Sequence, residues 1–396
     1  MRSFRTVVLR ALILAATFAL VLPSARALGE EPVKITGLTD VNGNTSPRLG
    51  LNDDLVVKLS GKDPIDPAKY ALFLDGREIR ALMDTRYDSK NHALVFRLRR
   101  NSDNADAWTG LLGSPTAMTR QVSVTLGEVK PSPATAQPTI SADGGDPHFQ
   151  LVVISGWWLV VGTVVVLVTF ILVWGGARQS TILKDSLLPQ LAPRDQPYSL
   201  GRWQMAFWFT LIFASFIFLL ALLWDYNTVT PQALILMGIS GATALFAVAI
   251  DVTKDTPVDA ANNKLRALGL NTHDDVIRIR QEKADREAKK KAIGAGDPTI
   301  SQLEKEIADK QQLLDTFEGA VAPYKSRGWY HDLTTDINGP ALHRLQVFCW
   351  TWVLGGVFII GVYRNLAMPQ FSDTLLALMG VSSAGYVGFK YPEKQN

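Results

Sequence analysis

The chain has 396 residues, and its formal net charge of +3 is too small to predict nucleic-acid binding. Its 47% apolar residues and mean hydropathy of +0.10 average long apolar runs with long polar runs, a pattern typical of a membrane protein with soluble parts. The single cysteine, Cys349, excludes disulfides within the chain, cysteine-based zinc clusters and CxxC redox chemistry.

Residues 1–27 predict a secretory signal peptide. Three arginines form a basic start, residues 11–22 form a short apolar core, and Ala25-Arg26-Ala27 is a small-x-small cleavage site. An uncleaved anchor is the alternative. Both interpretations place the chain that follows outside the cytoplasm.

Residues 28–128 predict an all-β extracytoplasmic domain, because short β-branched runs alternate with turn residues. The strongest local signal is Asp75-Gly76, which favours a type I′ hairpin turn. The number and spacing of the runs resemble an immunoglobulin-like (Ig-like) sandwich, although the disulfide and its tryptophan are missing. The polar loop at Asp40 has the oxygen ligands of a calcium loop but lacks the distal glutamate, so a polar turn is the preferred interpretation.

Residues 129–150 are rich in Pro, Ala, Ser, Thr and Gly and predict a flexible tether. Residues 151–174 are apolar throughout and predict a first transmembrane helix, flanked by tryptophans of the kind that lie at membrane interfaces. Residues 175–199, with three prolines, predict a cytoplasmic linker.

Two membrane repeats are predicted, residues 200–250 and 342–390, and within them residues 200–248 align with 342–390 without a gap at an offset of 142. Both carry Arg-x-Gln-x-x-x-Trp and then Leu-x-Leu-Met-Gly-x-Ser-x-Ala. Apolar composition alone does not place polar residues in register across two segments. We therefore predict a parallel duplication of a two-helix membrane unit, which gives five transmembrane helices in total.

A polar insertion, residues 251–341, separates the two membrane repeats. A charged helix is predicted from Thr272, followed by a break at Gly294–Pro298 and a second helix that Thr299 or Ser301 caps. The second helix carries apolar residues at 3-and-4 spacing, which favours an antiparallel helical hairpin or a self-associating coiled coil. These residues are Ile300, Leu303, Ile307, Leu314, Phe317 and Val321.

Positive residues collect in the loops after the first, third and fifth spans, whereas the short loops inside the repeats carry almost none. The positive-inside rule then places the β domain outside and the insertion and the C-terminal tail, residues 391–396, in the cytoplasm. A bacterial inner membrane fits this topology, and a eukaryotic secretory membrane is the alternative. Parallel repeats predict a pseudo-two-fold axis along the membrane normal.

The repeat motifs supply the candidate functional or helix-contact residues. Arg202 and Arg344 are expected to reach lipid phosphate or, alternatively, to line a pore mouth. Gln204 and Gln346 are expected to bond a neighbouring helix. The remaining candidates are the tryptophans of the first motif and small residues four apart, which predict close helix packing or, alternatively, a gate: Trp208, Trp350, Gly238, Ser240, Ala242, Gly380, Ser382, Ala384 and Gly388.

The sequence predicts no cofactor, no metal site and no catalytic residue. No Asp, Glu, Lys or His lies in the middle of a predicted span, which disfavours a pump or ion-coupled transporter. His331, Asp332, Asp336 and His343 cluster before the fourth span but fit no zinc spacing.

The leading hypothesis is a non-enzymatic membrane protein that couples or scaffolds between its two soluble modules. Its expected partners are the lipid bilayer, further copies of the chain and unidentified proteins on both sides, with no nucleic acid. An oligomeric ion channel formed by the two-helix units is the alternative, and a membrane enzyme is a third.

Overall fold

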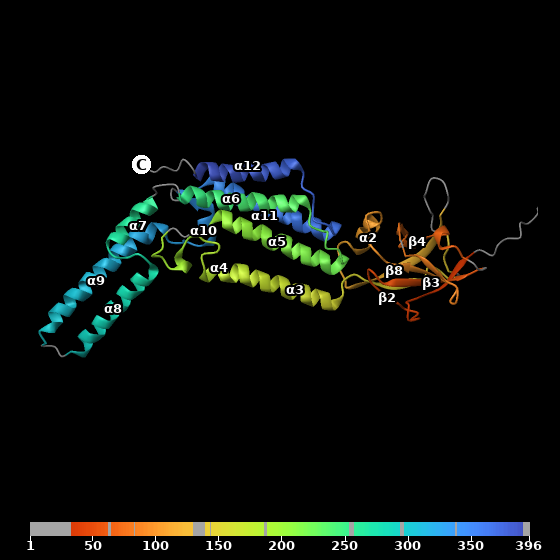
Figure 1. Ribbon diagram of the computed structural model, residues 1–396, viewed down its shortest axis with the longest axis horizontal. Coiled ribbons are helices and arrows are strands. Elements are labelled where there is room, and N and C mark those ends of the chain that lie inside the picture. The colour runs from red at the N-terminus through yellow and green to blue at the C-terminus, as the bar shows by residue number, and fades with distance from the viewer. Residues whose placement is uncertain are drawn as a thin grey trace, which may run out of the picture. The chain divides into compact units, whose positions relative to one another are not determined.

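The computed structural model describes residues 33–61, 65–82, 84–129, 139–142, 144–185, 188–252, 257–293, 297–336 and 339–390. The predicted signal peptide lies outside these residues. The chain divides into two compact units (Figure 1). The β unit comprises the chain up to Leu111 and Thr119–Val152, and the helical unit comprises Leu112–Met118 and the chain from Val153.

The β unit contains two sheets. One has four strands in the order β1-β3-β7-β6, and the other has five in the order β2-β9-β8-β4-β5. The strands are β1 (Lys34–Thr39), β2 (Arg48–Leu49), β3 (Asp54–Ser60), β4 (Tyr70–Leu74), β5 (Arg77–Glu78), β6 (Arg86–Asp88), β7 (Ala93–Arg97), β8 (Thr119–Glu128) and β9 (His148–Val152).

Alternating side chains form the core of the β unit. Val122, Val124 and Leu126 of β8 are fully buried, as are Leu55 and Val57 of β3. This period of two is what a sheet with one buried face requires. Each sheet therefore contributes one apolar face to the core.

The predicted turns of the β unit form as their residue types require. Asp75 and Gly76 both have positive φ, as a type I′ turn demands, and they join β4 to β5. Asp40 accepts hydrogen bonds from the backbone and side chain of Asn44, at 2.9 and 2.6 Å. Those bonds lower the pKa of the Asp40 carboxyl, and the loop has the geometry of a polar turn.

Two predictions for this part of the chain were wrong. The unit is not all-β, because helix α2 (Ala105–Leu112) buries Trp108 completely. The segment predicted as a flexible tether also contains β9, which pairs with β8 and β2. Phe149 and Leu151 of β9 are buried, so this short alternation provides enough apolar surface to hold a strand in the sheet.

The helical unit contains a bundle and a hairpin. Its helices are α3 (Gly156–Phe170), which continues through the π-helical turn Ile171–Gly175 into α4 (Gly176–Gln179), then α5 (Leu200–Leu223), α6 (Pro231–Val252), α7 (Pro257–Ala267), α8 (His273–Ala292), α9 (Thr299–Val321), α10 (Trp329–Thr334), α11 (Leu342–Asn365) and α12 (Asp373–Lys390).

Three of these segments are long and apolar enough to cross a membrane: Gly156–Gln179, Leu200–Leu223 and Leu342–Asn365. The first begins five residues later than predicted, because Leu151 and Val152 belong to β9. A shorter apolar stretch lies in α6, Pro231–Phe246. The helical unit is therefore suited to a membrane, in agreement with the sequence.

Four helices of the bundle form a ring in which α5 contacts α6, α6 contacts α12, α12 contacts α11, and α11 contacts α5. Helix α3 lies against α5, where Gly162 faces Ile217. Leu200, Val347 and Tyr386 share one apolar cluster. The starts of α5 and α11 therefore lie at the same end of the bundle as the end of α12.

The bounds of the paired helices correspond at the offset seen in the sequence. Helices α5 and α11 each contain 24 residues, and both end at a residue in the left-handed conformation, Trp224 and Leu366. Ser199 occupies the N-cap position of α5, but its side chain makes no capping bond.

Helices α8 and α9 form an antiparallel hairpin (Figure 1). The ion pairs between the two helices show the direction, since Arg280 pairs with Glu318 at the base and Lys290 pairs with Glu304 near the tip. Each such exposed pair contributes only about 0.2–1 kcal/mol. The apolar stripe of α9 is the main source of the association.

The two hairpin helices start differently. Thr272 and Asp275 form a capping box at the start of α8. Neither Thr299 nor Ser301 caps α9, although one of the two was predicted to. Instead, the Asp297 carboxylate accepts hydrogen bonds from the Thr299 backbone N–H at 2.9 Å and from its hydroxyl at 2.6 Å.

The capping box predicts a pH dependence for the hairpin. Backbone hydrogen bonds from Asn271 and Thr272 lower the pKa of the Asp275 carboxyl. A lowered folded-state pKa stabilises the fold above the unfolded value of about 3.9, and that stabilisation is lost as the pH falls through the folded value. Hydrogen exchange across α8, corrected for intrinsic rates, should show protection falling with acid by a larger step in the wild type than in Asp275→Asn. Equal steps in both proteins would contradict the prediction.

Candidate functional site

The deepest polar contact in the bundle joins α5 to α11. Gln204 and Thr351 are both fully buried, and the Gln204 amide Nε2 donates to Thr351 Oγ1 at 3.2 Å. Thr351 in turn donates to the Val347 carbonyl at 2.7 Å. The Gln204 carbonyl Oε1 is buried without a hydrogen-bond partner among the described residues.

The matching glutamine makes a different contact. Gln346 Nε2 donates to Ser382 Oγ at 3.2 Å, which joins α11 to α12. Ser240, at the position that matches Ser382, donates instead to carbonyls of its own helix. Phe209 stands where a match to Thr351 would be. The two glutamines therefore have equivalent places in the sequence but different partners.

Close packing of small residues within the chain would place the small-residue stripe between its helices. The stripe does not lie there. Gly238, Ala242, Ala384 and Gly388 are exposed, and Gly380 is half-buried. A Cβ atom built at any of these three glycines would meet nothing within 4 Å. The stripe faces outward, and the buried Leu236, Ala244, Met379 and Tyr386 occupy the inner faces of α6 and α12.

The close helix contact lies elsewhere, between α5 and α6. A Cβ atom on Gly201 would lie 3.0 Å from the Ala244 Cα and 3.2 Å from its backbone nitrogen. The motif tryptophans also differ, because Trp208 is fully buried against Phe358 whereas Trp350 is half-buried. Gly201 carries no motif signal, so the sequence alone did not single it out.

The two motif arginines bind backbone carbonyls. Arg202 Nη1 donates to the carbonyls of Thr181 and Lys184 at 3.0 and 2.8 Å. Arg344 Nη1 donates to the Thr335 carbonyl at 2.6 Å. Each arginine thus fixes the loop that precedes its helix, a role that differs from the predicted reach to lipid phosphate.

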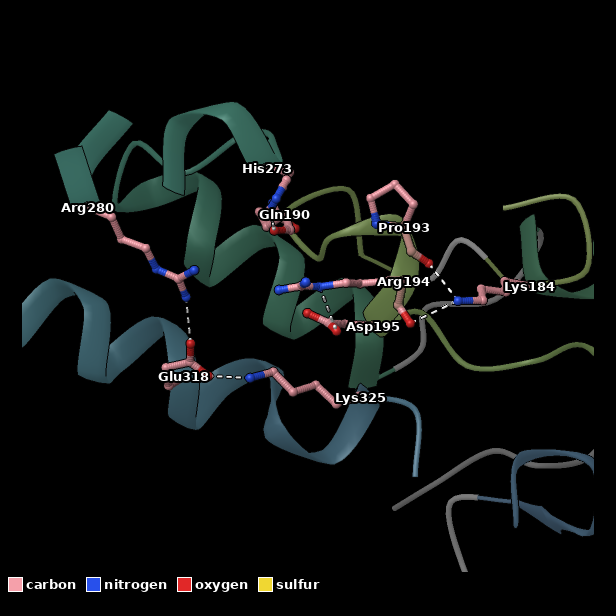
Figure 2. Close-up of polar contacts among 9 residues, drawn as sticks. All are labelled: Lys184, Gln190, Pro193, Arg194, Asp195, His273, Arg280, Glu318 and Lys325. Carbon is pink, nitrogen blue, oxygen red and sulfur yellow. Dashed lines mark hydrogen bonds and ion pairs between the residues drawn. The ribbon is translucent and has the colours of Figure 1, made fainter. Parts of the chain in front are cut away.

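The segment before α5 is folded and contains a buried lysine. Lys184 is 1% exposed, and its Nζ donates to the carbonyls of Pro193 and Arg194 at 3.0 and 2.9 Å (Figure 2). Burial lowers the pKa of this ammonium group, while the negative charges of Asp195 and Asp332 oppose that shift. Lys184 therefore holds the linker in a loop, although composition predicted only a linker here.

The same linker is bonded to the base of the hairpin. Gln190 Nε2 donates to the Leu270 carbonyl at 2.9 Å, and His273 Nδ1 lies 3.1 Å from the Gln190 carbonyl oxygen (Figure 2). Glu318 pairs with both Arg280 and Lys325. An apolar cluster lies beneath these bonds: Leu188, Leu191, Val258, Leu265, Leu270, Val276, Ile279, Leu314, Phe317 and Val321.

The polar residues before α11, among them His331 and Asp332, make hydrogen bonds that hold neighbouring segments of the chain together. The buried Asp332 carboxylate accepts hydrogen bonds from the Ser326 hydroxyl at 2.6 Å and from the backbone N–H groups of Arg327 and Tyr198 at 3.0 and 3.1 Å. His331 Nδ1 lies 2.9 Å from Thr335 Oγ1. Within the described ranges, no group of three or more His, Cys, Asp or Glu residues is placed to hold a metal ion.

We call the linker, the hairpin base and α10 together the joint. Trp329 of α10 packs against Trp203 of α5 and Phe348 of α11, and Leu333 is fully buried in the same cluster. The joint therefore ties the hairpin to the starts of two bundle helices through contacts on several elements.

Comparison with protein-family models, with curated proteins and with solved structures finds no match to this chain.

The contrast between two glycines of the bundle gives a testable prediction. Gly201→Ala should destabilise the bundle by about 1–3 kcal/mol, because the new methyl group meets the Ala244 backbone. Gly356→Ala, in α11, is the matched control and should be neutral or slightly stabilising, because its methyl group enters open space. Thermal unfolding of both variants in the same detergent measures the difference, and equal melting temperatures would refute the assignment.

Proposed function

We propose that this chain is a non-enzymatic integral membrane protein that couples or scaffolds between an extracytoplasmic β module and a cytoplasmic helical hairpin. The observation that carries the proposal is the joint. A hairpin on a free tether would follow the membrane helices only loosely. The joint instead fixes the hairpin base to the starts of α5 and α11 through buried apolar and polar contacts.

The proposal includes a topology of five transmembrane helices: α3, α5, α6, α11 and α12. The apolar residues exposed on α3, such as Val164, Leu167 and Phe170, suit contact with lipid. If α3 spans the bilayer, the chain before it and the linker after it lie on opposite faces. The positive charges of the linker and the insertion favour the cytoplasm for the hairpin. The proposed location is a bacterial inner membrane, which fits a signal peptide followed by five spans.

The proposal also includes an Ig-like β module and a parallel duplication of the two-helix unit. The equal lengths and matching ends of α5 and α11 support the duplication. The ring of contacts supports it further, because exchanging α5 with α11 and α6 with α12 leaves the ring unchanged. A pseudo-two-fold axis along the membrane normal is the expected relation.

The outward small-residue stripe of α6 and α12 suggests how copies of the chain associate. Small residues let helix backbones approach closely in a membrane, where interhelical contacts are driven by packing. Within this proposal, the exposed Gly238, Ala242, Ala384 and Gly388 form a contact between protomers.

The coupling function predicts that both soluble modules are required. One variant lacks residues 28–152 but keeps the signal sequence, and a second lacks residues 287–305, the distal third of the hairpin. The second deletion leaves the apolar cluster of the joint intact. Neither variant should restore the wild-type phenotype to cells that lack the protein, although both should insert in the membrane at wild-type levels. Full restoration by both variants would contradict coupling.

An oligomeric ion channel remains the second candidate, and one observation favours it. The unpartnered Gln204 Oε1 is a polar group at depth in the bundle, where a passing ion or water would find an acceptor. The neighbouring polar side chains of Thr351 and Ser240 already make hydrogen bonds within the chain. The channel is therefore the less favoured of the two functions.

Conductance separates the two functions. The purified protein in planar bilayers should carry no discrete current if it couples or scaffolds. The double variant Gln204→Leu/Gln346→Leu should still assemble, because each lost interhelical hydrogen bond is worth only about 0.6 kcal/mol. Discrete currents in the wild type that change in this variant would establish the channel and displace the coupling proposal.

A further inference from the structure

A groove of about 390 Å³ lies where α10 meets the first turn of α11. Helix α10 supplies Tyr330 and His331 to its lining, and α11 supplies Leu342 and Leu345. Thr335, just after α10, lines it as well. The volume is near the lower end of the range for ligand sites. The groove therefore has room for one part of a long molecule, whose remainder lies outside it.

The groove lies at one end of a helix that is suited to cross a membrane. Leu342 is the first residue of α11, which is long and apolar enough to span a bilayer, and it is 78% exposed. Leu345 begins a row of exposed apolar residues in steps of three or four, which keep them on one helix face. The row continues with Cys349, Val353, Val357 and Ile360. Leu345 thus belongs both to the groove and to a face of α11 along which a hydrocarbon chain can lie.

His331 supplies a polar group to the groove, and its contacts fix which ring nitrogen carries the proton. Thr335 Oγ1 lies 2.7 Å from the His331 carbonyl oxygen and 2.9 Å from His331 Nδ1. A threonine hydroxyl has one proton, and two oxygens attract each other at 2.7 Å only when a proton lies between them. The hydroxyl therefore donates to the carbonyl and accepts from Nδ1–H. In the neutral imidazole Nε2 is then an acceptor, and no residue that the structure describes bonds it.

An acceptor beside an apolar wall favours a ligand that has an N–H donor near a hydrocarbon chain. The primary ammonium of an ethanolamine phospholipid has three N–H donors, as a lysine side chain has, whereas the quaternary ammonium of choline has none. The phosphate and the acyl chains of the two lipids are the same, so His331 Nε2 distinguishes their headgroups. An anionic phospholipid fits less well, because the residues that line the groove include no lysine or arginine to balance its charge.

We infer that the groove between α10 and α11 binds an ethanolamine phospholipid of the surrounding bilayer. Its ammonium group donates to His331 Nε2, and an acyl chain passes Leu342 and Leu345 and follows the exposed face of α11. The inference goes beyond coupling and rests on one part of the proposed function, that α11 spans the bilayer. A lipid in this place contacts α10, which belongs to the joint, and so connects the joint to the membrane.

Native mass spectrometry of the delipidated full-length chain measures the binding. Ethanolamine and choline phospholipids with identical acyl chains are titrated separately. The first molecule of the ethanolamine lipid should bind about tenfold more tightly than the first molecule of the choline lipid, because one charge-assisted hydrogen bond distinguishes them. Equal affinities would overturn the inference, and so would tighter binding of an anionic phosphatidylglycerol with the same chains.

Two variants separate the polar and apolar contacts. His331→Leu should abolish the preference for ethanolamine and leave the affinity for the choline lipid unchanged, whereas His148→Leu, an exposed histidine of β9, should keep the preference. Leu342→Gln should weaken the binding of both lipids, whereas Leu234→Gln, at an exposed leucine in the first turn of α6, should weaken neither. A preference that persists in His331→Leu would overturn the inference.

A photoreactive lipid locates the site in the unmodified chain, so this result does not depend on how the variants fold. An ethanolamine phospholipid with a diazirine in its acyl chain is incorporated in liposomes with the wild-type protein. Crosslinks should concentrate in residues 340–353, and the matching choline lipid should give fewer of them there. An even spread over the exposed helix faces would overturn the inference and leave coupling standing. A chain whose α11 does not insert would overturn the proposed topology and this inference together.

Discussion

The carboxylate of Asp332 makes the contact on which the arrangement of the helical unit depends. Its three hydrogen bonds bring together the segment that leaves the hairpin and the segment that enters α5, which are far apart in the sequence. Leaving a buried donor without its acceptor costs about 1–3 kcal/mol. Because Asp332 satisfies three donors at once, the joint has one arrangement, and α10 is fixed between α5 and α11.

The bundle follows a second constraint, that a polar group surrounded by apolar helices must find its partner within the protein. The buried Gln204 meets this constraint through Thr351, whereas the exposed Gln346 donates to Ser382, so two equivalent sequence positions do not produce equivalent contacts. The arginines at the helix starts bind loop carbonyls for the same reason. The polar residues of the repeats therefore have a structural role, which is to join helices and loops of the same chain.

Much of the helical part was predictable, because the 3-and-4 spacing and the long apolar runs are local signals. The hairpin and the Asp75-Gly76 turn belong to this class. Strand β9 was not predictable, because five residues next to a Pro- and Ser-rich stretch gain their stability from pairing with β8 and β2, which are distant in the sequence. The small-residue stripe was recognised, but its direction depends on which face of α6 meets α5, and the close contact at Gly201 has no motif. Lys184 was missed because its carbonyl partners come from a loop whose path composition does not define.

The length of the hairpin has a consequence for the protein as a physical spacer. Helix α8 has 20 residues, so the tip stands about 30 Å from the base at 1.5 Å per residue. The base cluster uses only the proximal residues of α8 and α9. Adding or removing whole heptads beyond that cluster would change the spacing by about 10 Å each time without altering the membrane helices. The length of the hairpin is thus independent of the bundle that anchors it.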